Sequence, residues 1–266
     1  MTPELLLSHL DAGTPWPAPS GLDLPAAYRQ ALAVRALRQR RGELPAGYKI
    51  GFTNRRIWDR YRVYAPIWGS VWDTTLSLCD GVGRLSLAHT CQPRLEPEAV
   101  FGLLEAPPRD ASLQQLFEAI DWVAPGFEIV QSHCPDWKFT AADTVADGGL
   151  HARLLVGRRV PVREIAGDAA ALERLLAAAT VVLQRDGRRL ETGRGANVLD
   201  GPLHALRHFV AELQACPGAP ALRAGDLVTT GTWTDAWPVA PGETWQADFS
   251  APLSPLTLHV DAVAPA

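Results

Sequence analysis

The chain has 266 residues, a formal net charge of −4 and 20% charged residues, so it is long enough to bury a substantial core and too near neutral for a nucleic-acid-binding surface. No apolar run is long enough to span a membrane, and residues 1–25 lack the basic and apolar regions of a secretory signal. The 4 cysteines have no paired spacing, which is typical of thiols that stay reduced, so we expect a cytoplasmic protein without nucleic-acid or membrane partners.

The N-terminal part of the chain is predicted to be helical. A short helix is expected around Pro3–Leu10, followed by a proline-rich link over 14–19. A longer helix is expected from about Pro25 to Arg41, because proline suits the first helical turn and a glycine follows the end. These features predict a helical segment over residues 1–45.

A short strand-like run, Pro45–Thr53, contains one lysine between glycines. Lys49 lies between Tyr48 and Ile50, which makes it a candidate for burial, and burial lowers the pKa of a lysine. A lysine whose stem packs while its amine reaches water is the commoner arrangement. The aromatic segment that follows, 58–72, either lines an apolar pocket or belongs to the core.

Three glutamates lie in predicted strands. Glu96 and Glu98 are two apart before an apolar run, so in an extended strand both carboxylates leave the same face. Pro97 between them cannot donate to a strand ladder, which predicts an edge or a bulge. Glu128 stands alone in a second apolar run, Gly126–Val130. Three converging carboxylates would form an oxygen-rich site for Mg²⁺ or Mn²⁺. The alternative is that Glu96 and Glu98 belong to a solvated strand face and Glu128 pairs with an arginine.

The remaining elements alternate between helix and strand. The polar, glycine-rich stretch Asp143–Gly149 either approaches a ligand or forms a surface loop. The hydroxyl-rich stretch Thr229–Thr232 reads as a tight turn that could offer N–H and O–H donors to a carboxylate, although such turns also occur without a ligand. The other predictions are helices over 112–120, 169–177 and 201–213, a strand from Arg153, a hairpin over 181–190 that turns at Asp186-Gly187, and strands over 226–230, 244–249 and 256–260.

Seven short motifs, taken together and in order, resemble a known family. They are Gly47–Gly51, the Glu-x-Glu pair of Glu96 and Glu98, Phe127–Val130, Trp137-Lys138, Asp143–Asp147, Thr192–Ala196, and Ala224–Asp226 with Thr230–Thr232. From about residue 30 onward, this set is similar to the 2-keto-4-pentenoate hydratase branch of the fumarylacetoacetate hydrolase superfamily, which also holds the 4-oxalocrotonate decarboxylases.

The resemblance implies a fold and a site. The fold is α+β, a mixed β-sheet roll with helices packed outside, in which the helical segment 1–45 precedes a catalytic domain over 46–266. One Mg²⁺ or Mn²⁺ would be held by Glu96, Glu98 and Glu128, and Lys49 would transfer protons. The substrate would be a small 2-oxo or 2-hydroxydienoic acid, and the protein a homo-oligomer, a dimer or larger. The substrate-binding residues implied by the motifs are Thr230, Gly231, Thr232, Asp143, Asp147 and Lys138.

The reaction expected first is hydration of a 2-hydroxy-2,4-dienoate to a 4-hydroxy-2-oxo acid. Decarboxylation of a 2-oxo-3-enedioate in the same pocket is the second possibility. Hydrolytic C–C cleavage of an acylpyruvate needs a base that activates water, commonly a His–Glu pair, and no convincing pair stands out in the sequence. A binding module that kept only the fold is disfavoured because the three glutamates and the lysine are all present.

The chain departs from its relatives at Ile67–Gly69, Gly148–His151 and Asp200–Pro202, where hydratases tend to carry other residues. These differences leave hydration and decarboxylation both open. Three histidines have no assigned role: His133, His151 and His204.

Overall fold

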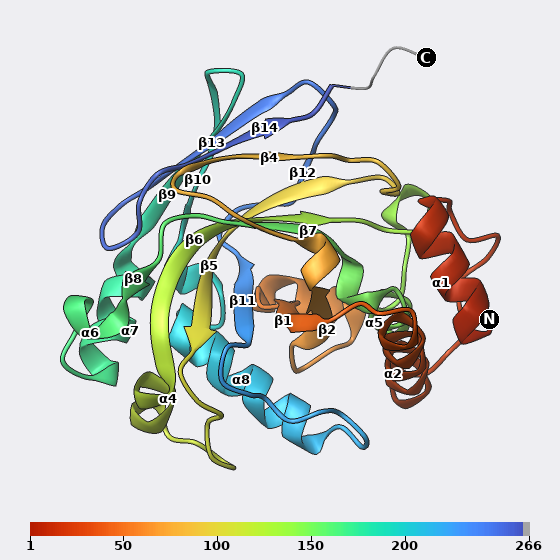
Figure 1. The fold of residues 1–266 in the computed structure, drawn as a ribbon, viewed down its shortest axis with the longest axis horizontal. Coiled ribbons are helices and arrows are strands. Elements are labelled where there is room, and N and C mark those ends of the chain that lie inside the picture. The colour runs from red at the N-terminus through yellow and green to blue at the C-terminus, as the bar shows by residue number, and fades with distance from the viewer. Residues whose placement is uncertain (263–266) are drawn as a thin grey trace.

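The computed structural model describes residues 1–262, which form two β-sheets with helices packed around them (Figure 1). The larger sheet contains β1 (Pro45–Gly51), β2 (Ile67–Trp72), β3 (Leu76–Leu78), β5 (Arg94–Leu103), β6 (Ile120–Val130), β7 (His151–Val156), β8 (Val160–Pro161), β11 (Leu227–Thr232) and β12 (Trp237–Pro238). The smaller sheet contains β4 (Val82–Leu85), β9 (Thr180–Arg185), β10 (Arg188–Arg194), β13 (Thr244–Phe249) and β14 (Leu256–Val260).

Both sheets are mixed. The larger one runs in the order β2-β1-β11-β5-β6-β7-β3, with β12 beside β5 and β8 beside β6. Its neighbours are antiparallel except for the parallel pairs β1/β11 and β3/β7. The smaller sheet runs in the order β10-β9-β13-β14-β4. Figure 1 shows that the long strands β5 and β6 curve strongly, so the larger sheet curls around the interior. The expected α+β class and mixed β-sheet roll are confirmed.

Helices cover the outside of the sheets. They are α1 (Pro3–Ala12), α2 (Leu24–Arg40), α3 (Trp58–Tyr61), α4 (Leu113–Ala119), α5 (Ala141–Ala146), α6 (Val162–Ile165), α7 (Ala169–Ala178) and α8 (Pro202–Ala215). Short 3₁₀ turns are η1 (Arg55–Ile57), η2 (Asp73–Thr75), η3 (Pro135–Trp137), η4 (Gly148–Leu150) and η5 (Gly195–Asn197). Figure 1 places α1 and α2 on the side of the molecule opposite α6 and α7. Within residues 1–262, no helix has the length and apolar character needed to cross a membrane.

The predicted helices begin where side chains can cap them. Thr2 and Asp23 precede α1 and α2, and each side chain accepts a hydrogen bond from a backbone N–H of the first turn. Ser112 and Gln115 form a capping box at the start of α4. These caps satisfy N–H groups that have no partner within the helix, so they help to fix where each helix begins.

The stretch Asp143–Gly149, for which a surface loop was one of two expectations, is not an exposed loop: its first residues belong to the buried helix α5, and its glycines begin η4. Asp143 forms a capping box with Thr140, and its Oδ1 also accepts the Ser20 N–H at 2.7 Å. The link between α1 and α2 is thereby tied to α5, and Leu6, Trp16 and Val145 share one apolar cluster. The N-terminal segment therefore packs against α5. The domain boundary at residue 45 stays a prediction.

Two expectations about β5 and β11 are corrected. Pro97 lies in β5 between β11 and β6 and not at a sheet edge. A bulge does occur nearby, but in β11: the ladder between β5 and β11 is interrupted between Thr229 and Thr232, opposite Ala99 and not at Pro97. This stretch is therefore a bulged end of β11 and not a tight turn, and the Pro97 carbonyl accepts the Trp233 N–H at 3.0 Å.

Candidate metal centre and active-site cavity

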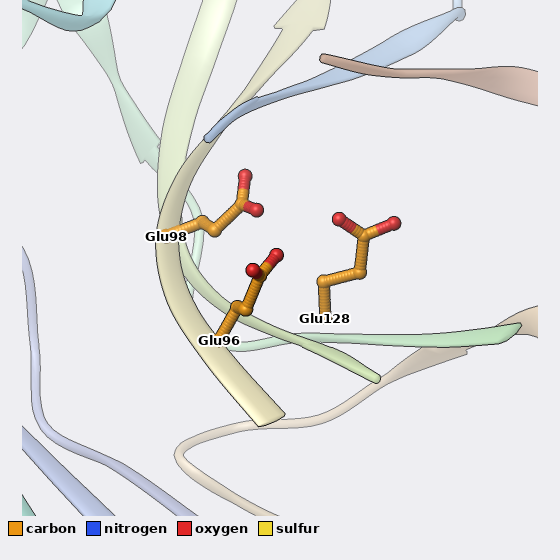
Figure 2. A group of neighbouring side chains, drawn as sticks. All are labelled: Glu96, Glu98 and Glu128. Carbon is orange, nitrogen blue, oxygen red and sulfur yellow. The ribbon is translucent and has the colours of Figure 1, made fainter. Parts of the chain in front are cut away.

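Three glutamates converge on one space inside the curled sheet (Figure 2). Glu96 and Glu98 project from the same face of β5, and the strand register places Glu96 directly opposite Glu128 on β6. One carboxylate oxygen from each residue lies within 4.8 Å of the others. Glu98 and Glu128 are fully buried, and Glu96 is half-buried. The arrangement of three carboxylates predicted from the sequence is present.

The cluster concentrates negative charge away from water. Burial, followed by the neighbouring carboxylates, raises the pKa of Glu98 well above its ordinary value, and burial also raises the pKa of Glu96 to about 7. Two buried oxygens, Glu98 Oε1 and Glu128 Oε2, accept no hydrogen bond within the described residues. Carboxylate oxygens that accept no hydrogen bond are suitable ligands for a hard divalent cation such as Mg²⁺ or Mn²⁺.

Lys49 on β1 is the cation nearest to the cluster. Its Nζ lies 3.1 Å from Glu128 Oε2, and its side chain is 3% exposed. Burial lowers the pKa of Lys49, but attraction to Glu128, Glu96 and Glu98 outweighs burial and raises it above its ordinary value. Of the two arrangements that the sequence left open for this lysine, the buried one is observed, and without an ion its pKa is raised and not lowered.

Glutamate 128 remains the ionised member of the cluster. Burial by itself raises its pKa, but Lys49 and the hydrogen bond from His151 together lower the pKa below its ordinary value. The local charge pattern is therefore an ion pair between Lys49 and Glu128 beside two carboxyls that resist ionisation.

A cavity of about 380 Å³ reaches this cluster, with Lys49 and Glu96 in its wall. Its aromatic lining consists of Phe52, Tyr61, Trp137 and Phe139. Tyr61 stacks between Phe52 and Phe139, with ring centroids 5.0 and 5.4 Å apart. Of the aromatic segment 58–72, Tyr61 lines this cavity while Trp68 and Trp72 are buried in the core, so each sequence alternative describes part of it. The cavity suits a small, largely apolar substrate with an anionic end.

Sequence reasoning missed two arginines in the cavity wall, Arg60 and Arg94. The guanidinium of Arg94 lies 4.3 Å from the ring centroid of Trp137, and that indole donates to the Gln92 carbonyl at 3.0 Å. Among residues 1–262, neither arginine forms an ion pair with an acidic side chain. The two-residue period of a strand, which places Glu96 and Glu98 on one face, also places Arg94 on that face. This spacing could have identified Arg94 from the sequence.

The donors of Thr230, Gly231 and Thr232 are already engaged. The Gly231 N–H donates to Glu98 Oε2 at 2.7 Å, the Thr230 hydroxyl donates to the Ala99 carbonyl at 2.9 Å, and the Thr232 hydroxyl donates to the Thr234 carbonyl at 3.0 Å. Gly231 and Thr232 line the cavity, and Thr230 is fully buried. In this structure the Gly231 N–H holds Glu98, and both threonine hydroxyls are bonded to backbone carbonyls. The binding of a substrate carboxylate by these residues stays a prediction.

Gly231 offers a test of this support. Its φ is +95°, and an added Cβ would overlap the Thr53 hydroxyl. We expect Gly231→Ala to lower the free energy of unfolding by more than the roughly 1–3 kcal/mol of backbone strain and to weaken divalent-ion binding, because the Glu98 hydrogen bond would be displaced. Gly242→Ala is the matched control, since its φ is +84° and no atom lies within 4 Å of the added Cβ. Equal losses in denaturant unfolding of the two variants would contradict the steric part of this prediction.

The other residues implied by the resemblance do not line the cavity. Asp143 is held by Ser20 and Thr140, as described above. Asp147 accepts the backbone N–H of His133 at 2.9 Å, and its Oδ1 lies 2.6 Å from His133 Nδ1. Both aspartates are buried, so they shape the wall from behind.

Lys138 and His204 also lie outside the cavity. The Lys138 side chain is 81% exposed and pairs with Asp136 at 3.3 Å. His204 lies on α8, partly exposed to solvent. Neither residue has a contact that links it to the glutamate cluster within the described chain.

The structure does contain a His–Glu pair that the sequence did not reveal. Nδ1 of His151 lies 2.8 Å from Glu128 Oε1. Burial lowers the pKa of His151 and outweighs the opposing effect of Glu128. His151 lines a second cavity of about 400 Å³, beside Arg38 and Arg153, and not the cavity that Lys49 lines. The pair is therefore poorly placed to activate a water next to a substrate in the first cavity.

Comparison with known proteins decides the family. No family model matches the chain. The chain is 33% identical over 221 residues to the 2-hydroxyhexa-2,4-dienoate hydratase of Comamonas testosteroni, covering 82% of this chain and 79% of the relative. It is 31% identical over 218 residues to a 4-oxalocrotonate decarboxylase of a Pseudomonas species, with 82% and 79% covered. The chain belongs to the hydratase and 4-oxalocrotonate decarboxylase branch of the fumarylacetoacetate hydrolase superfamily.

Solved structures of this superfamily share the fold. The 4-oxalocrotonate decarboxylase from Pseudomonas putida G7, complexed with magnesium and adipate, superposes with a TM-score of 0.84 at 24% identity over 97% of this chain and 95% of that chain. A fumarylpyruvate hydrolase from Pseudomonas aeruginosa, in complex with Mn²⁺ and pyruvate, gives a TM-score of 0.61 at 17% identity over 81% and 89% of the two chains. The curled mixed sheet with N-terminal helices is thus the fold of the hydratase and decarboxylase branch, and the chain is an enzyme of that branch.

Proposed function

We propose that the protein is a divalent-metal-dependent hydratase that adds water to a 2-hydroxy-2,4-dienoate and forms a 4-hydroxy-2-oxo acid. The observation that carries the proposal is the cluster of Glu96, Glu98 and Glu128 beside Lys49 at one end of an aromatic-lined cavity. The hydratase among the relatives supports the choice of reaction. Such substrates come from the cleavage of aromatic rings, which places the activity in aromatic catabolism.

The three glutamates would hold the ion. When bound, Mg²⁺ or Mn²⁺ would supply a Lewis acid and a positive template for the carboxylate and 2-oxygen of the substrate. Glu98 is kept in place by the Gly231 N–H, and Glu128 by His151, so both ligands are oriented before any ion arrives. The structures of relatives that contain magnesium or Mn²⁺ support this choice of metal.

Lys49 would move the protons of the reaction. Its amine takes the proton of the 2-hydroxyl group, and its ammonium returns a proton to C5, which converts the dienol to a 2-oxo-3-enoate. Water then adds across C3 and C4, with its oxygen bonded to C4 and its proton to C3. The buried position of Lys49 excludes bulk water from this transfer.

The experiment that tests the proposal uses the purified protein with Mg²⁺ or Mn²⁺ and a panel of 2-hydroxydienoates and 2-oxo-3-enedioates. Loss of dienoate absorbance without release of CO₂ is the expected result. Release of CO₂ from enedioates, with dienoates left intact, would replace hydration by decarboxylation. Absence of turnover of every panel member with both metals would contradict the enzyme proposal.

A second candidate, decarboxylation of a 2-oxo-3-enedioate, is favoured by Arg94. This cation lines the cavity, is held over Trp137 and has no acidic partner in the part of the chain described. A substrate with a second carboxylate would supply that partner, and arginine suits carboxylate recognition. Acylpyruvate hydrolysis gains no such support, because the His151–Glu128 pair does not face this cavity.

Arg94→Gln distinguishes the two candidates. If the substrate is a dicarboxylate, we expect the variant to raise KM about 10- to 100-fold for an enedioate, since a charged hydrogen bond is worth about 1.5–3 kcal/mol, and to leave KM for a monocarboxylate nearly unchanged. Arg56→Gln is the control, because Arg56 is exposed and does not line the cavity. Unchanged KM values for both substrate classes would show that Arg94 does not bind a second carboxylate.

Homo-oligomeric assembly and a cytoplasmic location stay predictions.

A further inference from the structure

His151 lies between the candidate metal ligand Glu128 and the hydroxyl of Thr75 in η2. It is the first residue of β7 and is buried, with Nδ1 2.8 Å from Glu128 Oε1 and Nε2 2.8 Å from Thr75 Oγ1. An ionised carboxylate only accepts, so Nδ1 carries the proton and Nε2 of the neutral ring accepts from the Thr75 hydroxyl. Both ring nitrogens therefore have partners, and the plane of the imidazole is fixed.

The partner on the far side of the ring is itself well held. Thr75 Oγ1 accepts the Trp72 backbone N–H at an N···O distance of 3.2 Å, which leaves the single hydroxyl proton for His151 Nε2. The Trp72 amide, the Thr75 hydroxyl, the His151 ring and the Glu128 carboxylate thus form one buried chain of contacts. None of the residues in this chain lines the cavity that Lys49 lines.

The two oxygens of Glu128 consequently differ. Oε1 accepts the His151 N–H, whereas Oε2 lies 3.1 Å from Lys49 Nζ and accepts no aligned hydrogen bond within residues 1–262. Without His151, the terminal torsion of a glutamate is broad and the two oxygens can exchange places. With His151 present, Oε1 is held by the imidazole, and Oε2 faces Lys49 and the neighbouring carboxylates.

We propose that His151 is a positioning residue, which fixes the Glu128 carboxylate so that Oε2 alone serves the metal centre and the Lys49 ion pair. The inference rests on the metal site of the proposed function. Partners behind a ligand commonly set its orientation in this way, and their loss typically costs about 10- to 100-fold in metal affinity or activity. His151 does not line the cavity, so it acts through Glu128 and not on the substrate.

The test compares His151→Leu with His151→Asn. Leucine removes the donor to Glu128, whereas the amide of asparagine can place an N–H near the position of Nδ1. Binding of Mn²⁺ is measured by titration calorimetry and by the Mn²⁺-induced rise in Tm, both without substrate. We expect His151→Leu to weaken Mn²⁺ binding about 10- to 100-fold and His151→Asn to recover most of that loss.

Two further variants keep the test decisive where His151→Leu does not fold. Thr75→Val removes the hydroxyl that orients the ring and should weaken Mn²⁺ binding less than His151→Leu does, while Thr75→Ser should keep near wild-type affinity. His208→Asn is the control, since His208 lies on α8 and lines neither cavity of this site. Its Mn²⁺ affinity should equal that of the wild type.

The outcomes separate this inference from the proposed function. If the wild type binds Mn²⁺ and His151→Leu binds it equally well, the positioning role is overturned while the metal site stands. The same conclusion follows if folded His151→Asn binds no better than His151→Leu, or if Thr75→Val binds like Thr75→Ser. If the wild type binds no Mn²⁺, even with a 2-oxo acid present, the metal site itself is overturned, and the inference with it.

Discussion

Replacement of Lys49 by methionine should reduce kcat by about 10²- to 10⁴-fold, which is the usual contribution of a general acid–base group. Methionine keeps the length and the apolar stem that packs in the buried run around Lys49 but has no proton to transfer. Divalent-ion affinity should stay the same or rise, because the variant removes a positive charge 3.1 Å from Glu128 Oε2. Steady-state kinetics and calorimetry on the same preparation give the two readouts.

Lys138→Met is the matched comparison, since it removes the same charge from an exposed side chain outside the cavity. Its kcat should stay near that of the wild type, and a large loss would instead support the substrate-binding role that the resemblance implied. For Lys49→Met, wild-type kcat together with lost metal binding would make the lysine a structural counter-ion. Exchange of solvent deuterium into the substrate should stop along with turnover, and exchange that persists would assign proton transfer to another residue.

Glu98→Gln should abolish or severely weaken divalent-ion binding, by more than the roughly 10- to 100-fold expected for an outer partner, because it removes one of three anionic ligands. The same variant should have the opposite effect on the protein without metal. Glu98 is fully buried, and its pKa is raised by burial and by the nearby carboxylates, so a neutral amide relieves an unfavourable charge.

Differential scanning calorimetry at about pH 8 separates these effects. Without metal, Glu98→Gln should melt above the wild type, whereas excess Mn²⁺ should raise Tm of the wild type only. Glu164→Gln is the control, since this glutamate is exposed and lies outside the cluster. If the wild type neither binds Mn²⁺ in calorimetry nor gains Tm with a substrate analogue present, the assignment of the three ligands is wrong.

The dependence on pH follows from Glu96, whose pKa is raised by burial from 4.5 to about 7. A carboxyl with a raised folded-state pKa stabilises the protein fully below 4.5, and this contribution is lost as the pH rises through about 7. The metal-free protein should therefore lose stability over this interval, and Glu96→Gln should flatten the loss. Mn²⁺ affinity should change in the opposite sense, falling as the pH drops below about 7, because protons compete for the ligand. Denaturant unfolding and Mn²⁺ titrations across this interval provide the check.

The sequence by itself determined the features that depend on near neighbours. Pro25 near the start of α2 and Gly42 after its end placed that helix, and Asp186-Gly187 placed the β9–β10 turn. The two-residue period of a strand placed Glu96 and Glu98 on one face. Each of these inferences uses residues only a few positions apart, where the geometry of the backbone is already known.

Polar composition misled where burial decided the outcome. A surface loop was one of two expectations for Asp143–Gly149, yet its first residues lie in the buried helix α5, and its aspartates are bound by Ser20, Thr140 and His133. Thr229–Thr232 reads as a turn, yet it continues β11 as a bulge opposite Ala99. In both cases the partners that satisfy the polar groups lie far away in the chain, so the local sequence could not show them.

Only the tertiary structure decided that the site exists as a unit. Glu128 meets Glu96 through the register of β5 and β6, and a slip of one residue would turn either carboxylate to the other face. Lys49 on β1 is separated from β6 by β11 and β5, so in a flat sheet these strands would lie about 14 Å apart, with side chains roughly perpendicular to it. The observed 3.1 Å between Lys49 Nζ and Glu128 Oε2 therefore requires the curl of the sheet. Curl and register arise from pairings between distant segments, which is why the motifs could name the residues but not place His151 and Arg94 beside them.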